Sequence, residues 1–268
     1  ILRAAISNNI YECCNKVDWL LENNDFLHID NGRIGLKYYY DIEMQIYHLI
    51  LNKSQIETTI NISDEAIDKA IKHAEEEQGF DYVVEQLDTI HKSLHRTVSL
   101  ITGKAGTGKT SIMLAIVKAY MENNYMMTAS ALSAMAAQRI TEATEFPAMT
   151  IHRTLGCQGL NDFTYNKDNH LITDVAFLDE GSMVNASLFL HWLEAIGDNT
   201  RIIISGDHKQ LPPIGFGNVF SDLIEMFDES VVSKLVKPMR QAEKSGILVD
   251  ANKIRENINP ISEKLQPR

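Results

Sequence analysis

Cysteine is scarce in this sequence, and its placement points to neither a disulfide framework nor a metal site. Cys13, Cys14 and Cys157 form no CxxC pair, and their spacing matches no zinc-ligand arrangement. Adjacent cysteines are poor bridge partners, because a disulfide needs a particular Cα and Cβ geometry. We therefore expect reduced thiols in a cytoplasmic protein.

Long hydrophobic runs and a targeting leader are also missing. No stretch of 18 or more apolar residues occurs, which excludes a helical membrane anchor. The chain begins at Ile1, without an initiator Met, a basic and then apolar leader, or a small-residue cleavage site. We expect it to be a piece of a longer protein.

Basic charge is in deficit. The formal net charge is −11, and residues 1–97 hold 9 basic and 17 acidic side chains against 16 and 19 in residues 98–268. This excludes a broad basic surface that would coat DNA, but not a narrow local groove. A nucleic-acid function must therefore be argued from motifs.

The first 51 residues combine helical patterns with a hairpin signal. Residues 11–21 place apolar side chains on one helical face, and a second helix is expected over residues 41–51. Between them, two short strands flank the turn signal Asp30-Asn31-Gly32. This order fits a winged-helix module, and it fits equally a small helical packing domain with an incidental hairpin.

Residues 52–80 are polar, and an acidic helix is expected to begin at Ser63. We place a domain boundary near residues 75–80, which divides the chain into a small, mainly helical domain with its linker (1–78) and a larger domain (79–268). In the second part, short apolar runs separated by helical stretches predict a parallel α/β sheet flanked by helices. The expected strands cover residues 98–102, 125–129, 175–178 and 201–205.

The strongest motif follows the first of these strands and fits G-x-x-x-x-G-K-[ST] in full. Its glycines permit a tight loop whose backbone N–H groups converge on phosphate, and the next helix N-terminus favours an anion. We expect Lys109 between the β- and γ-phosphates of ATP and the Thr110 hydroxyl on Mg²⁺. The residues predicted to contact nucleotide here are Gly103, Lys104, Ala105, Gly106, Thr107, Gly108, Lys109, Thr110 and Ser111.

Two acids end the apolar run at residues 175–178, on what we take to be a neighbouring strand. Asp179 suits the Mg²⁺ shell, because Mg²⁺ prefers oxygen ligands, and Glu180 suits polarisation of an attacking water. Both are expected at the carboxyl edge of the sheet, where open α/β sheets bind ligands. Paired acids also occur as simple strand terminators, and the phosphate loop upstream favours the catalytic interpretation.

The run at residues 201–205 leads into a polar loop that contains Gln210, Pro212 and Pro213. An amide side chain at such a strand end can report whether the γ-phosphate is present. Gln210 is that candidate, and the two prolines would stiffen the loop behind it. A surface turn would have a similar sequence.

Taken together, five motifs in order resemble the first motor domain of RecD-like DNA helicases, the 5′-to-3′ branch of superfamily 1. Besides the phosphate loop, the chain matches the family's DEASM box (with Gly181 in place of Ala), its GDxxQLPPIG and TIHRLLG segments, and its FRQAxxSxI motif (with Met239 in place of Phe). The resemblance covers residues 81–268 and implies a RecA-like P-loop fold. Residues 1–51 are similar only in pattern to the winged-helix region that precedes the family's motor.

The resemblance assigns further roles. It implies that Gln86 reads adenine and that Arg240 reaches the γ-phosphate. Ser133, Thr150 and His152 correspond to segments that lie along single-stranded DNA, although Leu132-Ser133-Ala134 replaces the family's Pro-Thr-Gly. For these three the competing interpretation is two helix caps and a packed histidine.

The function implied is ATP-driven movement on single-stranded DNA without sequence preference, either alone or with the other subunits of an exonuclease complex. The family's second motor domain supplies an arginine finger, so we expect this chain to bind Mg·ATP but hydrolyse it slowly. Three alternatives remain: a P-loop switch or loader that does not unwind DNA, a kinase for which no arginine-rich lid is seen, and a non-enzymatic binding module.

Overall fold

The computed structural model describes residues 27–30, 33–159 and 162–237. Its centre is a sheet of six parallel strands. In spatial order these are β10 (Val232–Leu235), β3 (Val98–Gly103), β9 (Arg201–Gly206), β8 (Val175–Asp179), β4 (Met127–Ala131) and β5 (Ala148–Thr150). The predicted parallel α/β sheet is confirmed.

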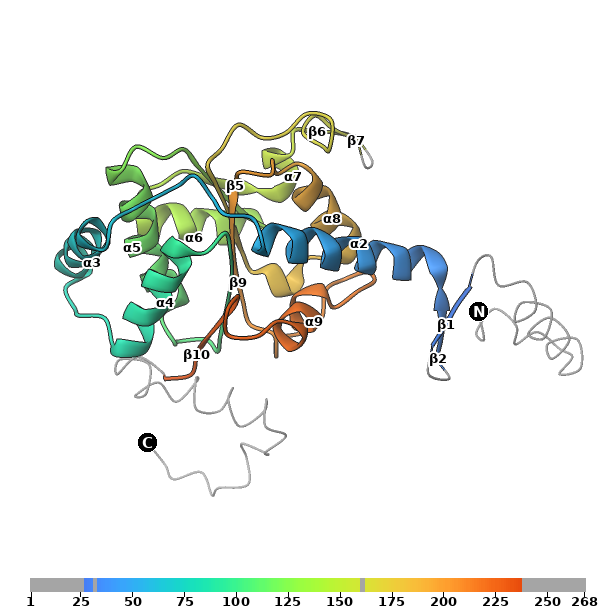
Figure 1. The fold of residues 1–268 in the computed structure, drawn as a ribbon, viewed down its shortest axis with the longest axis horizontal. Coiled ribbons are helices and arrows are strands. Elements are labelled where there is room, and N and C mark those ends of the chain that lie inside the picture. Colours follow the sequence, from blue (N-terminus) through green and yellow to red (C-terminus); the bar gives the residue numbers. More distant parts are fainter. Residues whose placement is uncertain (1–26, 31–32, 160–161, 238–268) are drawn as a thin grey trace, which may run out of the picture.

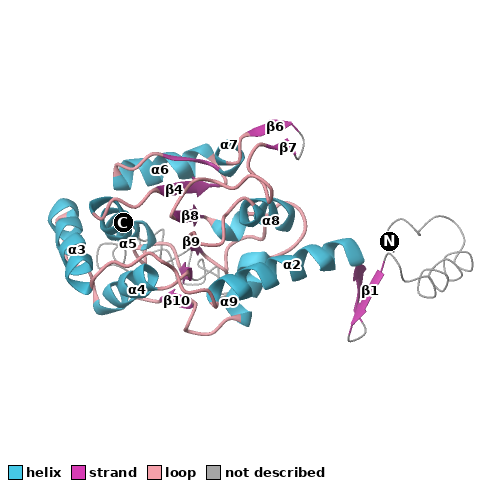
Figure 2. Ribbon diagram, turned by 45° about the horizontal axis from the view of Figure 1, so that its top comes forward, coloured by secondary structure: helices cyan, strands magenta, loops and turns pink. Residues whose placement is uncertain are grey.

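Helices cover both faces of the sheet, as Figures 1 and 2 show. One hydrophobic core lies beneath α2 (Lys37–Ser54), α7 (Ile151–Thr154), α8 (Ala186–Glu194) and α9 (Val219–Met226). The other core lies beneath α3 (Asp64–Gln78), α4 (Val84–His95), α5 (Lys109–Glu122) and α6 (Ala134–Thr144). The remaining elements are the antiparallel pairs β1 (Leu27–Asp30) with β2 (Arg33–Leu36) and β6 (Cys157–Gly159) with β7 (Asp162–Phe163), and the 3₁₀ turn η2 (Gly181–Met183).

The strands are apolar on both sides because successive side chains enter opposite cores. On β9, Ile202 and Ile204 pack into the first core, whereas Ile203 packs into the second. All three are fully buried. This explains why the strands appear in the sequence as continuous apolar runs without alternation.

The strand order differs from the prediction in one respect. β8, which ends in the two acids, does not neighbour β3, because β9 lies between them. Both β3 and β8 pair with β9 in parallel, so the carboxyl ends of all three strands still meet at one edge of the sheet. The order of strands is a tertiary property that sequence spacing does not encode.

The start of β4 was also predicted two residues too early. Asn124 adopts a left-handed backbone conformation (φ 61°). The Tyr125 hydroxyl accepts a hydrogen bond from the backbone N–H of Asn61 at 3.1 Å. The N–H of Met126 donates to Asp174 Oδ2 at 2.7 Å. These contacts fix the turn, and pairing with β8 therefore begins only at Met127.

The N-terminal elements are partly as predicted. The hairpin around residues 31–32 is present, and α2 covers the expected helix with longer ends. Figure 1 shows the hairpin at the end of α2 that lies away from the sheet. The helix predicted at residues 11–21 lies outside the described residues, so the winged-helix interpretation stays a prediction.

The helix predicted to begin at Ser63 is α3, whose N-cap is the Ser63 side chain, which accepts the N–H of Ala66. Both α2 and α3 contribute buried side chains to the cores of the α/β layers. The boundary at residues 75–80 stays a prediction about the organisation of the chain. No helix in the described ranges is long and apolar enough to cross a membrane.

Candidate nucleotide-binding site

The loop between β3 and α5 has the backbone geometry that its glycines predict. Gly106 and Gly108 lie at positive φ (82° and 88°), where residues with a Cβ are strained. A Cβ on Gly103 would stand 2.5 Å from Thr107 Oγ1 and 3.0 Å from Leu235. The loop can therefore close tightly only with glycine at these places.

The side chains of the loop hold its shape. Thr107 Oγ1 donates to the carbonyl of Lys104 at 2.8 Å. Lys109 Nζ donates to the carbonyls of Gly103 (2.6 Å) and Lys104 (3.3 Å). The lysine ammonium thus lies across the loop itself, where a phosphate placed in the loop would meet it.

The remaining loop residues differ in exposure and in whether their side chains already make hydrogen bonds. Ala105 and Thr110 are exposed, and the Thr110 side chain stands in the first turn of α5. Ser111 is turned away from the loop, because its hydroxyl donates to Gln78 Oε1 on α3 at 2.5 Å. Of the two hydroxyls, Thr110 is thus the better placed for a metal ion.

The two acids at the end of β8 share an electrostatic environment with the loop. Burial raises the pKa of Asp179, and a hydrogen bond from Ser205 and the positive charge of Lys109 oppose that rise. Burial also raises the pKa of Glu180, the charge of Asp179 adds to it, and Lys109 and Arg139 oppose it. The charge of Lys109 therefore acts on both acids, because the two motifs lie close together in space.

Glu180 has two further unusual features. Its backbone is left-handed (φ 54°), a conformation that is uncommon for residues other than glycine and that costs free energy. Its Oε2 atom is buried and has no hydrogen-bond partner among the described residues. A buried carboxylate oxygen without a donor is costly, and a bound water or ligand would supply one.

The departure at Gly181 from the family's alanine has a steric reason. A Cβ at this position would lie 2.7 Å from Ile204 Cγ2 on β9. Alanine would therefore require Ile204 or the turn η2 to shift.

The loop after β9 is anchored to β3 by a residue that the sequence did not single out. His208 Nδ1 lies 2.7 Å from Thr102 Oγ1, directly before the phosphate loop. Gln210 is exposed, and its N–H closes a turn with the carbonyl of Asp207 at 3.0 Å. The role of Gln210 as a phosphate sensor stays a prediction.

Gln86 is buried, and both atoms of its amide group make hydrogen bonds. Its Nε2 donates to the carbonyl of Thr107 at 3.1 Å, and its Oε1 accepts the N–H of Val83 at 3.1 Å. The amide thus ties the start of α4 to the phosphate loop. Its reading of adenine stays a prediction.

The predicted DNA-side residues lie at the end of β5 or shortly after β4 and β5. Ser133 and Thr150 are N-caps: their hydroxyls accept the N–H groups of Ala136 (3.1 Å) and Arg153 (3.3 Å). His152 is exposed, with its ring centroid 6.3 Å from that of Phe163. The competing interpretation as helix caps is thus present in the geometry, and DNA contact stays a prediction. Arg240 lies outside the described residues.

Sequence reasoning missed two side chains that act on the acids. Ser205, at the end of β9, bonds to Asp179, and a polar residue at that strand end was the available signal. Arg139 on α6 acts on Glu180, and no spacing in the sequence indicates that approach.

Comparisons with known proteins agree with this geometry. The AAA domain family profile matches residues 81–265. The RecBCD enzyme subunit RecD of Buchnera aphidicola subsp. Schizaphis graminum is 25% identical over 96% of this chain and 48% of its own length. The ATP-dependent RecD2 DNA helicase of Deinococcus radiodurans is 33% identical over 69% of this chain and 24% of its own length.

Among solved structures, the Pif1 helicase of Candida albicans is similar in fold, with a TM-score of 0.51 and 24% identity over 68% of this chain and 45% of that one. The chain thus spans about half the length, or less, of these relatives. The resemblance to RecD-like helicases that the motifs indicated is confirmed, and the chain belongs to the AAA domain family as a RecD-like member.

Proposed function

We propose that this chain is the ATP-binding part of an ATP-dependent motor. The motor moves on single-stranded DNA and separates the strands of duplex DNA that it meets. The observation that carries the proposal is the position of the phosphate loop and the two acids at one carboxyl edge of the sheet, where β3 and β8 both pair with β9 in parallel and the charge of Lys109 acts on Asp179 and Glu180. The relative named as an ATP-dependent RecD2 DNA helicase supports the same activity, and the relative named as the RecD subunit of a RecBCD enzyme is consistent with it.

The residues at this edge fit Mg·ATP. The glycine-shaped loop offers converging backbone N–H groups and a helix N-terminus for phosphate. Thr110 and Asp179 provide oxygen atoms of the kind that Mg²⁺ prefers. When bound, the metal would neutralise charge on the β- and γ-phosphates.

The chain's own groups account for the remaining chemistry. The Glu180 carboxylate, whose Oε2 atom has no donor among the described residues, would accept a hydrogen bond from the attacking water. Its raised pKa makes it a better proton acceptor than an exposed glutamate. Lys109 would leave the carbonyls of Gly103 and Lys104 for phosphate oxygens. Gln210 and Arg240 would respond to the γ-phosphate.

DNA would be held through its backbone, near Ser133, Thr150 and His152. Contacts to phosphate carry affinity but no sequence information, so specificity is expected to be low. Stepping would follow from alternate gripping of the strand as ATP is bound and hydrolysed.

The test is ATP turnover and fork unwinding by the protein at its natural full length, with and without single-stranded DNA. We expect DNA to stimulate hydrolysis, and Lys109→Ala to reduce it by roughly 10²–10³-fold, because one preorganised donor to the developing charge is lost. Lys118→Ala is the matched control. Lys118 lies on α5, as Lys109 does, and its substitution removes an ion pair with Glu77 of α3 (2.6 Å).

DNA-independent hydrolysis without unwinding would replace the motor by a switch or loader. Hydrolysis by Lys109→Ala at the wild-type rate would overturn the site itself. For the 268-residue chain alone we expect nucleotide binding with slow turnover, and robust DNA-stimulated hydrolysis would contradict that expectation.

A further inference from the structure

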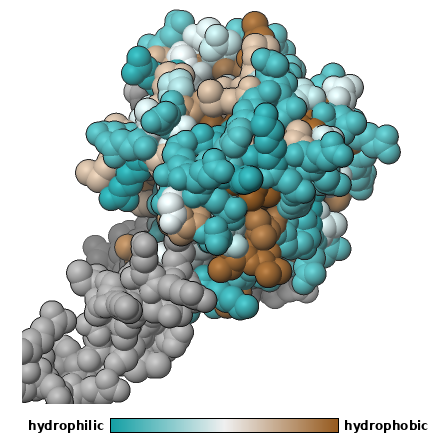
Figure 3. Space-filling model, turned by 90° about the vertical axis from the view of Figure 1, so that its left-hand side faces the viewer, coloured by the Kyte–Doolittle hydropathy of each residue, from teal (hydrophilic) through white to brown (hydrophobic). Residues whose placement is uncertain are grey.

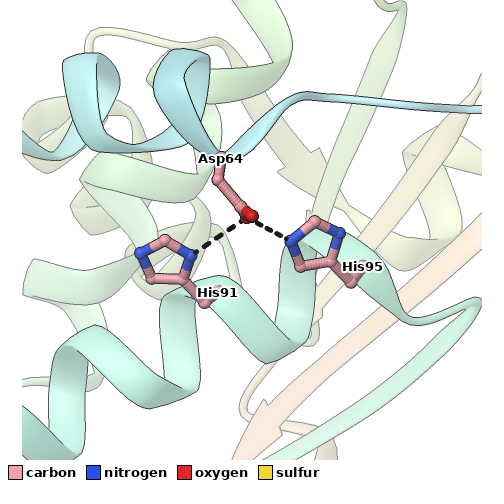
Figure 4. Close-up of side chains that lie close together, drawn as sticks. All are labelled: Asp64, His91 and His95. Atoms are coloured by element: carbon pink, nitrogen blue, oxygen red, sulfur yellow. Dashed lines mark hydrogen bonds and ion pairs between the residues drawn. The ribbon is translucent and has the colours of Figure 1, made fainter.

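Outside the nucleotide site, two histidines and an aspartate converge where α3 begins and α4 ends. His91 and His95 are four residues apart on α4, so both lie on one face of the helix. Asp64, in the first turn of α3, points between them (Figure 4). Within the described ranges this is the one group of three or more such side chains whose ligand atoms all lie within 4.8 Å of one another.

The distances fit a shared metal ion. Asp64 Oδ1 lies 2.9 Å from His95 Nε2 and 3.8 Å from His91 Nδ1. Two ligands about 2.0–2.1 Å from a tetrahedral Zn²⁺ are separated by roughly 3.3 Å. The two separations from Asp64 lie on either side of that value, and all three ligand atoms lie within 4.8 Å of one another. Side-chain rotations that draw the two histidine nitrogens toward Asp64 would admit the ion.

The second nitrogen of His91 is also provided for. His91 Nε2 lies 3.2 Å from Asp68 Oδ1, one turn further along α3. Metal-bound histidines usually donate their other ring N–H to a carboxylate, which fixes the tautomer and the orientation of the ring. His91 can therefore turn Nδ1 toward the ion while Asp68 accepts from Nε2.

We propose that Asp64, His91 and His95 bind a divalent cation of borderline softness, with Zn²⁺ as the representative. Two imidazole ligands favour Zn²⁺, Co²⁺ or Ni²⁺ over Mg²⁺ and Ca²⁺, which prefer oxygen. Three protein ligands leave a fourth position for water. The side chain of Asp64 is 74% exposed, and Figure 3 shows that the side of the molecule bearing α3 is largely hydrophilic, so an ion can enter from solution.

A bound ion would join α3 and α4. α3 contacts α5, the helix that follows the phosphate loop, and α4 contacts the loop itself. At its far end α3 holds Ser111 through Gln78, and α4 holds Thr107 through Gln86. A bound ion would therefore stabilise the packing behind the nucleotide site without contacting nucleotide. The inference is independent of the proposed motor function.

The test is direct titration of the full chain with Zn²⁺, and with Co²⁺ followed by its visible absorption, with Mg²⁺ as a negative control. We expect one site, a tetrahedral Co²⁺ spectrum, and a rise in Tm of about 3–6 °C at a Zn²⁺ concentration about 10-fold above Kd. To remove thiolate ligands, every variant carries serine in place of Cys13, Cys14 and Cys157.

Three variants and one control decide the outcome. His91→Ala and Asp64→Asn should abolish the spectrum, and Asp68→Asn should weaken binding by about 10–100-fold. His73→Ala removes a histidine that, among the described residues, pairs with the single carboxylate of Glu122 at 2.8 Å, and this variant should bind as the wild type does. Unchanged Zn²⁺ affinity in folded His91→Ala, or no site in the wild type, would overturn the proposal.

Discussion

The nucleotide site and the predicted DNA side, both at the carboxyl edge of the sheet, differ in how far their polar side chains are satisfied by hydrogen bonds. Around the phosphate loop, Glu180 keeps a buried oxygen without a donor and a left-handed backbone. On the predicted DNA side, the hydroxyls of Ser133 and Thr150 accept hydrogen bonds from backbone N–H groups of the helices that they cap. A strained residue with an unsatisfied oxygen indicates a ligand, whereas a satisfied cap is explained without one.

Replacing the Glu180 carboxylate should have a greater effect than any other change proposed below. Glu180→Gln keeps the shape of the side chain but removes its ability to accept a proton, so hydrolysis by the full-length protein should fall by about 10²–10⁴-fold. Nucleotide affinity should change little, because Lys109 and the loop remain. Steady-state turnover and a binding titration measure the two separately, and equal loss of both would assign Glu180 to binding.

A second variant tests the tight loop. Gly103→Ala places a Cβ against Thr107 and Leu235, so the free energy of unfolding should fall by about 1–3 kcal/mol and nucleotide affinity should drop. Gly159→Ala is the control, since a Cβ there meets nothing within 4 Å. Denaturant melts of both variants give the measurement, and similar stabilities would show that the loop is not closely packed.

A third pair of variants tests whether the Ser133 cap also contacts DNA. Ser133→Ala should lower the free energy of unfolding by about 0.5–2 kcal/mol, because α6 loses its cap. Ser133→Asp keeps an acceptor for the N–H of Ala136 and restores stability, but it sets a negative charge against a DNA phosphate. Weaker DNA binding in the folded aspartate variant would give Ser133 a second role, and unchanged binding would leave it as a cap.

The smallest effect is the pH dependence of stability. The pKa of Glu180 is raised in the folded chain, whereas an unfolded glutamate titrates near pH 4.3. Folding is therefore penalised as the pH rises through these values, and the penalty is absent below about pH 4. Glu180→Gln should raise the free energy of unfolding at pH 7 by about 1 kcal/mol or less, allowing for partial exposure. A stability gain that persists unchanged at acid pH would contradict this cause.

Local features of the site could be predicted from the sequence, because they depend on neighbouring residues. The glycine pattern and Lys109 define the loop, and Ser63 defines the start of α3. The acids were expected at a strand end, and Asp179 is the last residue of β8.

What could not be predicted depends on contacts between distant segments. The insertion of β9 between β3 and β8, the approach of Arg139 to Glu180 and the hydrogen bond of Gln86 to the loop arise only when the layers pack. In sequence the hydroxyl of Ser133 fits both a cap and a DNA contact, and only the folded helix shows that it bonds to the N–H of Ala136.

If the loop and the acids together form a triphosphate site, a titration with a fluorescent ATP analogue will detect it. We expect saturable binding that requires Mg²⁺ and weakens at least about tenfold in Lys109→Ala, because a charged hydrogen-bond donor contributes roughly 1.5–3 kcal/mol. Failure of the folded wild-type chain to take up nucleotide, or equal affinity in Lys109→Ala, would contradict the account.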